Sequence, residues 1–148
     1  MSDISVYSFS ELSPVMLYDI LKLRQDVFIV EQKSAYQDLD NLDPSALHLL
    51  IIHENILIAY CRIIPNHPVY ASPAIGRIVV RPSSRGQGLG KILINEALGL
   101  LKSQGYNQVM MEAQEHLEHY YNSFGFSRAS ESYDAEGIPH IKMKMSLK

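Results

Sequence analysis

The segment Arg85-Gly86-Gln87-Gly88-Leu89-Gly90 constrains the fold of this chain more than any other. It follows an apolar stretch at 74–81 that is typical of a strand, and an amphipathic helix follows it. Leu89, Leu93, Ala97 and Leu101 lie on one face of that helix. Glycines let the chain turn tightly and let an anion approach the backbone, and a helix start attracts negative charge. The segment therefore predicts a strand–loop–helix unit that binds a phosphate or pyrophosphate.

The glycine spacing excludes two nucleotide-binding loops. A P-loop places a lysine and a hydroxyl residue after its last glycine, whereas Lys91 and Ile92 follow Gly90. A dinucleotide fingerprint is G-x-G-x-x-G, whereas the glycines here fall at every second position. A glycine-rich turn without a ligand is the remaining alternative, which three glycines and an arginine at such a junction disfavour.

Hydrophobic periodicity predicts one domain spanning residues 1–148. We expect strands at 4–9, 47–53, 56–64, 74–81 and 107–113, helices at 14–29 and 115–124, and a final hairpin turning at 134–137. Ser13 and Pro14 mark the start of the first helix, and Gly105 ends the helix after the glycine loop. The order β-α-β-β-β-α-β-α-β-β predicts an α/β fold with an α+β type of mixed sheet.

Composition excludes several classes of protein. The chain has 148 residues, a net charge of −3 and no basic run, so no nucleic-acid partner is expected. It lacks a signal peptide and a long apolar stretch, and its single cysteine, Cys61, cannot form an internal disulfide; these features favour a soluble cytoplasmic protein with no membrane partner. Cys61 suits a buried strand position better than a nucleophile. His116 and His119 have no third ligand, so no metal is expected.

Two motifs carry a resemblance to a known family. Arg85-x-x-Gly88-x-Gly90 resembles the R/Q-x-x-G-x-G/A acyl-CoA loop of the GNAT superfamily of N-acyltransferases, and YNSFGF at 121–126 resembles that family's YEKLGF segment. The stretches LRQDVFIVEQKSAYQDLDNLD, AQEHLEHYYNSFGF and GIPHIKM are similar to the ElaA-like branch, so the resemblance covers nearly the whole chain. The pattern LR-x-x-VF-x-x-E is also similar to acyl-homoserine-lactone synthases, which share this fold.

The resemblance implies roles for particular residues. It implies that the amides of the loop bind the pyrophosphate of CoA, with Arg85, Gly86, Gln87, Gly88, Leu89, Gly90 and Lys91 taking part. It implies that the strand segment Ile78, Val79 and Val80 pairs its backbone with the pantetheine arm. Gln114 stands where many relatives have an asparagine that contacts this arm. Tyr121 aligns with the family's general acid, with its neighbour Tyr120 as the competitor and ordinary packing as the alternative.

Acyl transfer from a thioester to an amine needs a proton acceptor, donors for the oxyanion and a proton for the thiolate. Backbone N–H groups near Val79 or Val80 suit the oxyanion. Glu31, Glu112, His140 and water are the candidates for the base. Arg24, Arg62 and Arg77 could bind an acidic group of the acceptor or pair with carboxylates. Asp38, Asp40 and Asp43 could attract a cationic amine or hydrogen-bond their own backbone.

These observations predict an acetyl-CoA-dependent N-acetyltransferase that moves an acetyl group directly to a primary amine of a small molecule or peptide. The alternative is a non-catalytic acyl-CoA-binding module. An exposed sheet edge would also permit a homodimer.

Overall fold

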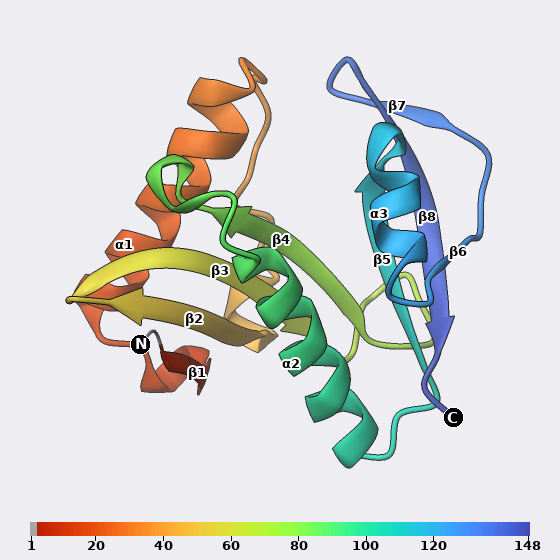
Figure 1. Ribbon diagram of the computed structural model, residues 1–148, viewed down its shortest axis with the longest axis horizontal. Coiled ribbons are helices and arrows are strands. Elements are labelled where there is room, and N and C mark those ends of the chain that lie inside the picture. The colour runs from red at the N-terminus through yellow and green to blue at the C-terminus, as the bar shows by residue number, and fades with distance from the viewer. Residues whose placement is uncertain (1–2) are drawn as a thin grey trace.

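One eight-stranded sheet organises the computed structural model, which describes residues 3–148 (Figure 1). Its strands are β1 (Asp3–Ser8), β2 (Leu47–His53), β3 (Ile56–Ile64), β4 (Ala74–Val80), β5 (Gln108–Gln114), β6 (Ser127–Arg128), β7 (Tyr133–Ala135) and β8 (Ile138–Ser146). The strand order is β1-β2-β3-β4-β5-β8-β6, with β7 paired to β8. Only β4 and β5 run parallel. The predicted mixed α/β fold is confirmed.

The α-helices are α1 (Pro14–Arg24), α2 (Leu89–Ser103) and α3 (Glu118–Asn122). The Ser13 hydroxyl accepts a hydrogen bond of 3.1 Å from the Met16 amide, which is the predicted helix start. The predicted helix at 14–29 is α-helical only to Arg24 and continues as a π-helix over Gln25–Glu31. The Gln32 amide accordingly donates to the Val27 carbonyl, five residues back. Apolar spacing over so short a stretch does not separate the two helix types.

Two further elements differ from the prediction. The helix expected at 115–124 is a 3-10 turn, Glu115–Leu117, followed by α3. The strand β6 was not predicted, because two residues carry no periodicity. The predicted final hairpin is present, and each strand for which bounds were predicted lies within one residue of them.

Helices cover both faces of the sheet. The predicted apolar face of α2 is buried against one face, where Leu49 and Ile51 also point. On the opposite face, Ile20 of α1 packs in a second cluster with Leu50 and Tyr60. Successive residues of β2 therefore enter different clusters, which explains why this strand reads as a continuous apolar run.

The strands β4 and β5 diverge, and this divergence creates the space for a site. They share one register pair, Ala74 with Met110, and the Met110 amide donates to the Pro73 carbonyl at 2.9 Å. Along the other edge of β4, the pairing with β3 is irregular beside Arg77, whose φ is +51°. Such a bulge bends a strand and increases its twist. Beyond the shared pair, each strand thus presents an inner edge without a strand partner.

Candidate active site

A cleft of about 500 Å³ lies between β4 and β5. Phe28, Glu31 and Gln32 border it from the π-helix and its end, and Leu117 and Tyr121 border it from the segment of α3. Of the residues predicted for the site, the cleft brings together Glu31, Ile78, Arg85, Glu112, Gln114, Tyr121 and His140. Two strands that are separated in sequence by α2 and two helical segments thus contribute to one cavity.

The glycine loop enters α2 in the left-handed conformation that glycine tolerates. Gly86 has φ +83° and Gly88 has φ +75°. The first backbone hydrogen bond of α2 runs from the Ile92 amide to the Gly88 carbonyl at 3.1 Å. The amides just before Ile92 have no partner within the helix, as at any helix start. Apart from the adjoining residues, a Cβ at Gly86 or Gly88 would meet no atom of residues 3–148 within 4 Å, so there is open space beside both glycines. That arrangement fits a pyrophosphate.

The remaining loop residues differ in their surroundings. Leu89 is buried in the core cluster, whereas the side chains of Gln87 and Lys91 are exposed. A Cβ at Gly90 would lie 3.3 Å from the Tyr120 hydroxyl, so α3 approaches this glycine closely.

Arg85 and Glu31 form an ion pair across 54 residues of sequence. Both guanidinium nitrogens, Nη1 and Nη2, donate to the carboxylate at 2.7 Å, and Nε donates to the Val80 carbonyl at 3.3 Å. The hydrogen bonds from Arg85 lower the pKa of Glu31. The pair connects the end of the π-helix to the glycine loop.

Tyr121 and Tyr120 occupy different environments. Tyr121 is buried, its ring packs edge-on against Phe126, and burial raises the pKa of its phenol to about 12. It lines the cleft, and its hydroxyl stays protonated at neutral pH. Tyr120 is 43% exposed and lies beside Gly90. Of the two phenols, only Tyr121 borders the cleft.

His140 is held in one tautomer. Its Nδ1 lies 2.8 Å from the Ile138 carbonyl, and because a carbonyl only accepts, Nδ1 carries the proton. In the neutral ring Nε2 therefore has a free lone pair. Nearby, the Tyr133 hydroxyl donates to Glu112 at 2.7 Å, and Gln114 lies 2.8 Å from His116 through its side-chain oxygen.

The chain is similar in sequence and in structure to known proteins of one family. The model of the Acetyltransferase (GNAT) domain matches residues 17–147. The chain belongs to the GNAT family. It is 39% identical to Protein ElaA of Escherichia coli over 137 residues, covering 90% of each chain. The crystal structure of Escherichia coli ElaA superposes on this GNAT protein with a TM-score of 0.91 and covers 98% of it and 99% of that chain.

Two other solved structures share the fold at different levels of sequence identity. An acyl-CoA N-acyltransferase from Pseudomonas aeruginosa is 36% identical, with a TM-score of 0.90 over 98% of this chain and 99% of that one. The AHL synthase LasI is 13% identical with a TM-score of 0.84, covering all of this chain and 91% of its own. At that identity the second likeness shows the fold alone. The predicted similarity to the ElaA-like branch is confirmed.

A smaller pocket, which we call the side pocket, opens from the cleft and has a volume of about 210 Å³. Its walls are Phe28, Gln32, Ser34, Tyr36, Arg77, Glu112, Gln114, Tyr133, Ala135, Glu136, Ile138 and His140, half of which also line the cleft. Sequence reasoning missed Phe28, Ser34, Tyr36 and Tyr133. The hairpin register was the available signal for Tyr133, since a turn at 136–137 sets it opposite His140.

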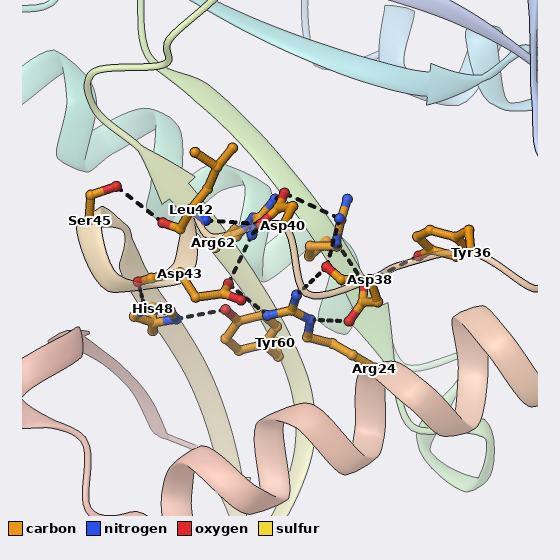
Figure 2. A network of polar contacts seen from close by, with 11 residues as sticks. Arg24, Tyr36, Asp38, Asp40, Leu42, Asp43, Ser45, His48, Tyr60 and Arg62 are labelled. Atoms are coloured by element: carbon orange, nitrogen blue, oxygen red, sulfur yellow. Dashed lines mark hydrogen bonds and ion pairs between the residues drawn. The ribbon is translucent and has the colours of Figure 1, made fainter.

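Three arginines and three aspartates form a buried network beside the side pocket (Figure 2). Arg24, fully buried, donates to Asp38 at 2.9 Å and to Asp43 at 2.8 Å. Arg62 donates to Asp43 at 2.9 Å and also to Asp40. Arg77 Nε lies 2.7 Å from Asp38. For the three arginines, the structure shows the predicted alternative of pairing with carboxylates. Of the predicted backbone contacts of the aspartates, Asp40 accepts a hydrogen bond of 3.1 Å from the Leu42 amide.

The network fixes the segment between the π-helix and β2. His48 Nε2 lies 2.9 Å from the Asp43 carbonyl and Nδ1 lies 2.7 Å from the Tyr60 hydroxyl, which extends the network into the sheet. Burial lowers the pKa of His48 and raises that of Tyr60. Since the segment carries Ser34 and Tyr36, the network also sets one wall of the side pocket.

The sequence raised other possibilities, namely a cysteine nucleophile, a metal site and a membrane-spanning segment. Cys61 is buried in the core, and burial raises the pKa of its thiol. Within residues 3–148, no three His, Cys, Asp or Glu side chains are grouped to hold a metal ion. No helix in that range has the length and apolar character needed to cross a membrane. A hollow of about 630 Å³, bordered by residues 65–73 and 105–108, contains none of the predicted site residues.

Proposed function

We propose that this GNAT protein is an acetyl-CoA-dependent N-acetyltransferase that acts in the cytoplasm on a primary amine of a small molecule or peptide. One observation carries the proposal: the cleft between β4 and β5 is lined by Arg85, the first residue of the glycine loop, and by Tyr121 and His140. A site for an anion, a protonated phenol and a free imidazole nitrogen are the groups that transfer from a thioester requires.

The donor would lie along the inner edge of β4. The loop amides at the start of α2 would hold its pyrophosphate. The edge of β4 that faces away from β3 at Ile78, Val79 and Val80 lies beyond the last pairing with β5, so its amides can hydrogen-bond the pantetheine arm. An N–H of the same segment would stabilise the negative charge that develops on the thioester oxygen.

In the proposed reaction, the acetyl group passes from the thioester sulfur to the amine nitrogen. The amine nitrogen forms a bond to the thioester carbon and loses a proton to His140 Nε2. The carbon–sulfur bond breaks, and the sulfur takes a proton from Tyr121. Glu31 is a poor candidate for the base, because the hydrogen bonds from Arg85 lower its pKa and occupy its carboxylate. The acetyl group moves directly, since Cys61 is buried in the core.

The test measures thiol release from acetyl-CoA over a panel of amines, with Tyr121→Phe and Tyr120→Phe as a matched pair. We expect kcat of Tyr121→Phe to fall about 100-fold with acetyl-CoA still bound, because the general acid is lost. Tyr120→Phe should change kcat less than threefold.

Two results would contradict the proposal. If the wild-type protein binds acetyl-CoA and no amine stimulates thiol release, the chain is an acyl-CoA-binding module. If Tyr120→Phe shows the larger loss, the acid is assigned to the wrong phenol.

A further inference from the structure

The side pocket holds an excess of negative charge. Glu112 on β5 and Glu136 in the β7–β8 turn line it, and neither forms an ion pair within 4 Å among residues 3–148. Among the described residues that form its walls, Arg77 is the single arginine or lysine. Arg77 Nε lies 2.7 Å from Asp38 and its Nη2 lies 3.3 Å from Asp40.

Neighbouring charges leave this excess in place. The three arginines and three aspartates of the buried network cancel one another. Lys142 stands opposite Glu112 in the β5–β8 register, but its ammonium lies over the Tyr70 ring, 5.5 Å from the centroid. The two glutamates therefore determine the sign of the potential in the pocket.

The other walls suit an organic cation. Phe28 and Tyr133 both provide aromatic surface to the pocket, Phe28 from the π-helix and Tyr133 from β7. The Tyr133 hydroxyl holds the Glu112 carboxylate at 2.7 Å, so the charge is fixed in position. A carboxylate next to aromatic rings attracts ammonium and guanidinium groups by charge and by cation–π interaction.

The side pocket is continuous with the reacting cleft. Phe28, Glu112 and His140 are among the residues that line both cavities. A molecule whose amine lies beside His140 thus extends its far end toward Glu112.

We propose that the acceptor carries a second cationic group, an ammonium or guanidinium, which binds in the side pocket against Glu112. The substrate class is accordingly a diamine or an amine with a guanidinium tail. This inference rests on the proposed N-acetyltransferase function and names the acceptor for the same cleft.

The test compares kcat/KM for alkyl amines of equal chain length that end in a hydroxyl, an ammonium, a guanidinium or a carboxylate. We expect the cationic tails to exceed the hydroxyl tail by about tenfold or more, which corresponds to about 1.4 kcal/mol. The carboxylate tail should be the poorest substrate. Salt should reduce the preference, because it screens the charge of an exposed carboxylate.

Glu112→Gln is the variant that tests the residue, and Glu136→Gln is a second variant at the rim. Each removes one negative charge, and Glu112→Gln retains an acceptor for Tyr133. We expect the ratio of kcat/KM for the ammonium tail to that for the hydroxyl tail to fall about tenfold in Glu112→Gln. Glu96→Gln is the control. Glu96 is exposed on α2 and lies outside both cavities, and its replacement removes one negative charge, as Glu112→Gln does.

The outcomes separate the two proposals. If amines are acetylated with no preference for a cationic tail, the inference fails and the proposed function stands. If Glu112→Gln slows both substrates equally, Glu112 acts on the reacting amine and the inference is wrong. If Glu96→Gln lowers the ratio as much, the preference comes from net charge and the inference is also wrong. If no amine is acetylated, both proposals fail.

Discussion

Replacing Asp43 with asparagine removes one negative charge from the middle of the buried network. Asp43 accepts hydrogen bonds from both Arg24 and Arg62 through the same oxygen, at 2.8 and 2.9 Å. Removing one partner of a buried ion pair costs about 3–5 kcal/mol, because the other charge stays buried without compensation. Asparagine keeps one acceptor oxygen, so we expect a loss of about 3 kcal/mol in the free energy of unfolding. For a chain of this size that lowers Tm by about 6–12 °C.

The assay is urea unfolding followed by circular dichroism, with Asp26→Asn as the control. Asp26 forms an exposed i,i+4 pair with Lys22 at 2.8 Å, so its replacement should cost less than about 0.5 kcal/mol. Because the network fixes the wall that carries Tyr36, we also expect KM for the amine to rise more than KM for acetyl-CoA. An Asp43→Asn protein as stable as Asp26→Asn would refute the reasoning that the network stabilises the fold.

Two further perturbations test the glycine loop and the acid stability. Gly88→Glu should weaken acetyl-CoA binding at least 30-fold while the fold survives, since a left-handed residue costs only about 1–2 kcal/mol. Gly88→Ala has the same backbone cost without the charge, and equal binding by the two variants in calorimetry would contradict a pyrophosphate site there. Burial raises the pKa of Asp40, but hydrogen bonds from Arg62 outweigh this and lower it from 3.8 to about 2. Its stabilisation is complete above pH 4 and is lost as the pH falls toward 2; because the group is partly exposed to solvent, the loss should be about 1 kcal/mol. Asp40→Asn should unfold with a smaller dependence on pH in that window, and an unchanged dependence would count against the pairing.

The strands and α2 could be predicted from the sequence because their signals are local. The alternation along Ile141 and Met143 and the spacing of Leu89 and Leu93 reflect burial on one face, which each element carries by itself. The change from α-helix to π-helix at Gln25 could not be predicted, because it depends on one extra residue per turn and leaves the apolar face intact.

The candidate site was partly predictable for the same reason. The glycine loop, Tyr121 and His140 lie in local motifs, whereas the ion pair of Arg85 with Glu31 joins positions 54 residues apart. Charge and residue type left two uses open for Arg24, Arg62 and Arg77, and only the folded arrangement shows that they pair with aspartates. The side pocket could not be predicted as a whole, since Phe28 and Tyr133 meet there only after β4 and β5 diverge.

The single register pair between β4 and β5 gives this sheet two inner edges in addition to its outer ones. Within residues 3–148, amides of β4 that point away from β3, and amides of β5 that point away from β8, have no strand partner beyond Ala74 and Met110. They should exchange with deuterium quickly although their strands are central in the order. An extended ligand with amides of its own would complete the sheet in the manner of an added strand. Protection of residues 76–80 on adding acetyl-CoA would then map the length of the arm along β4.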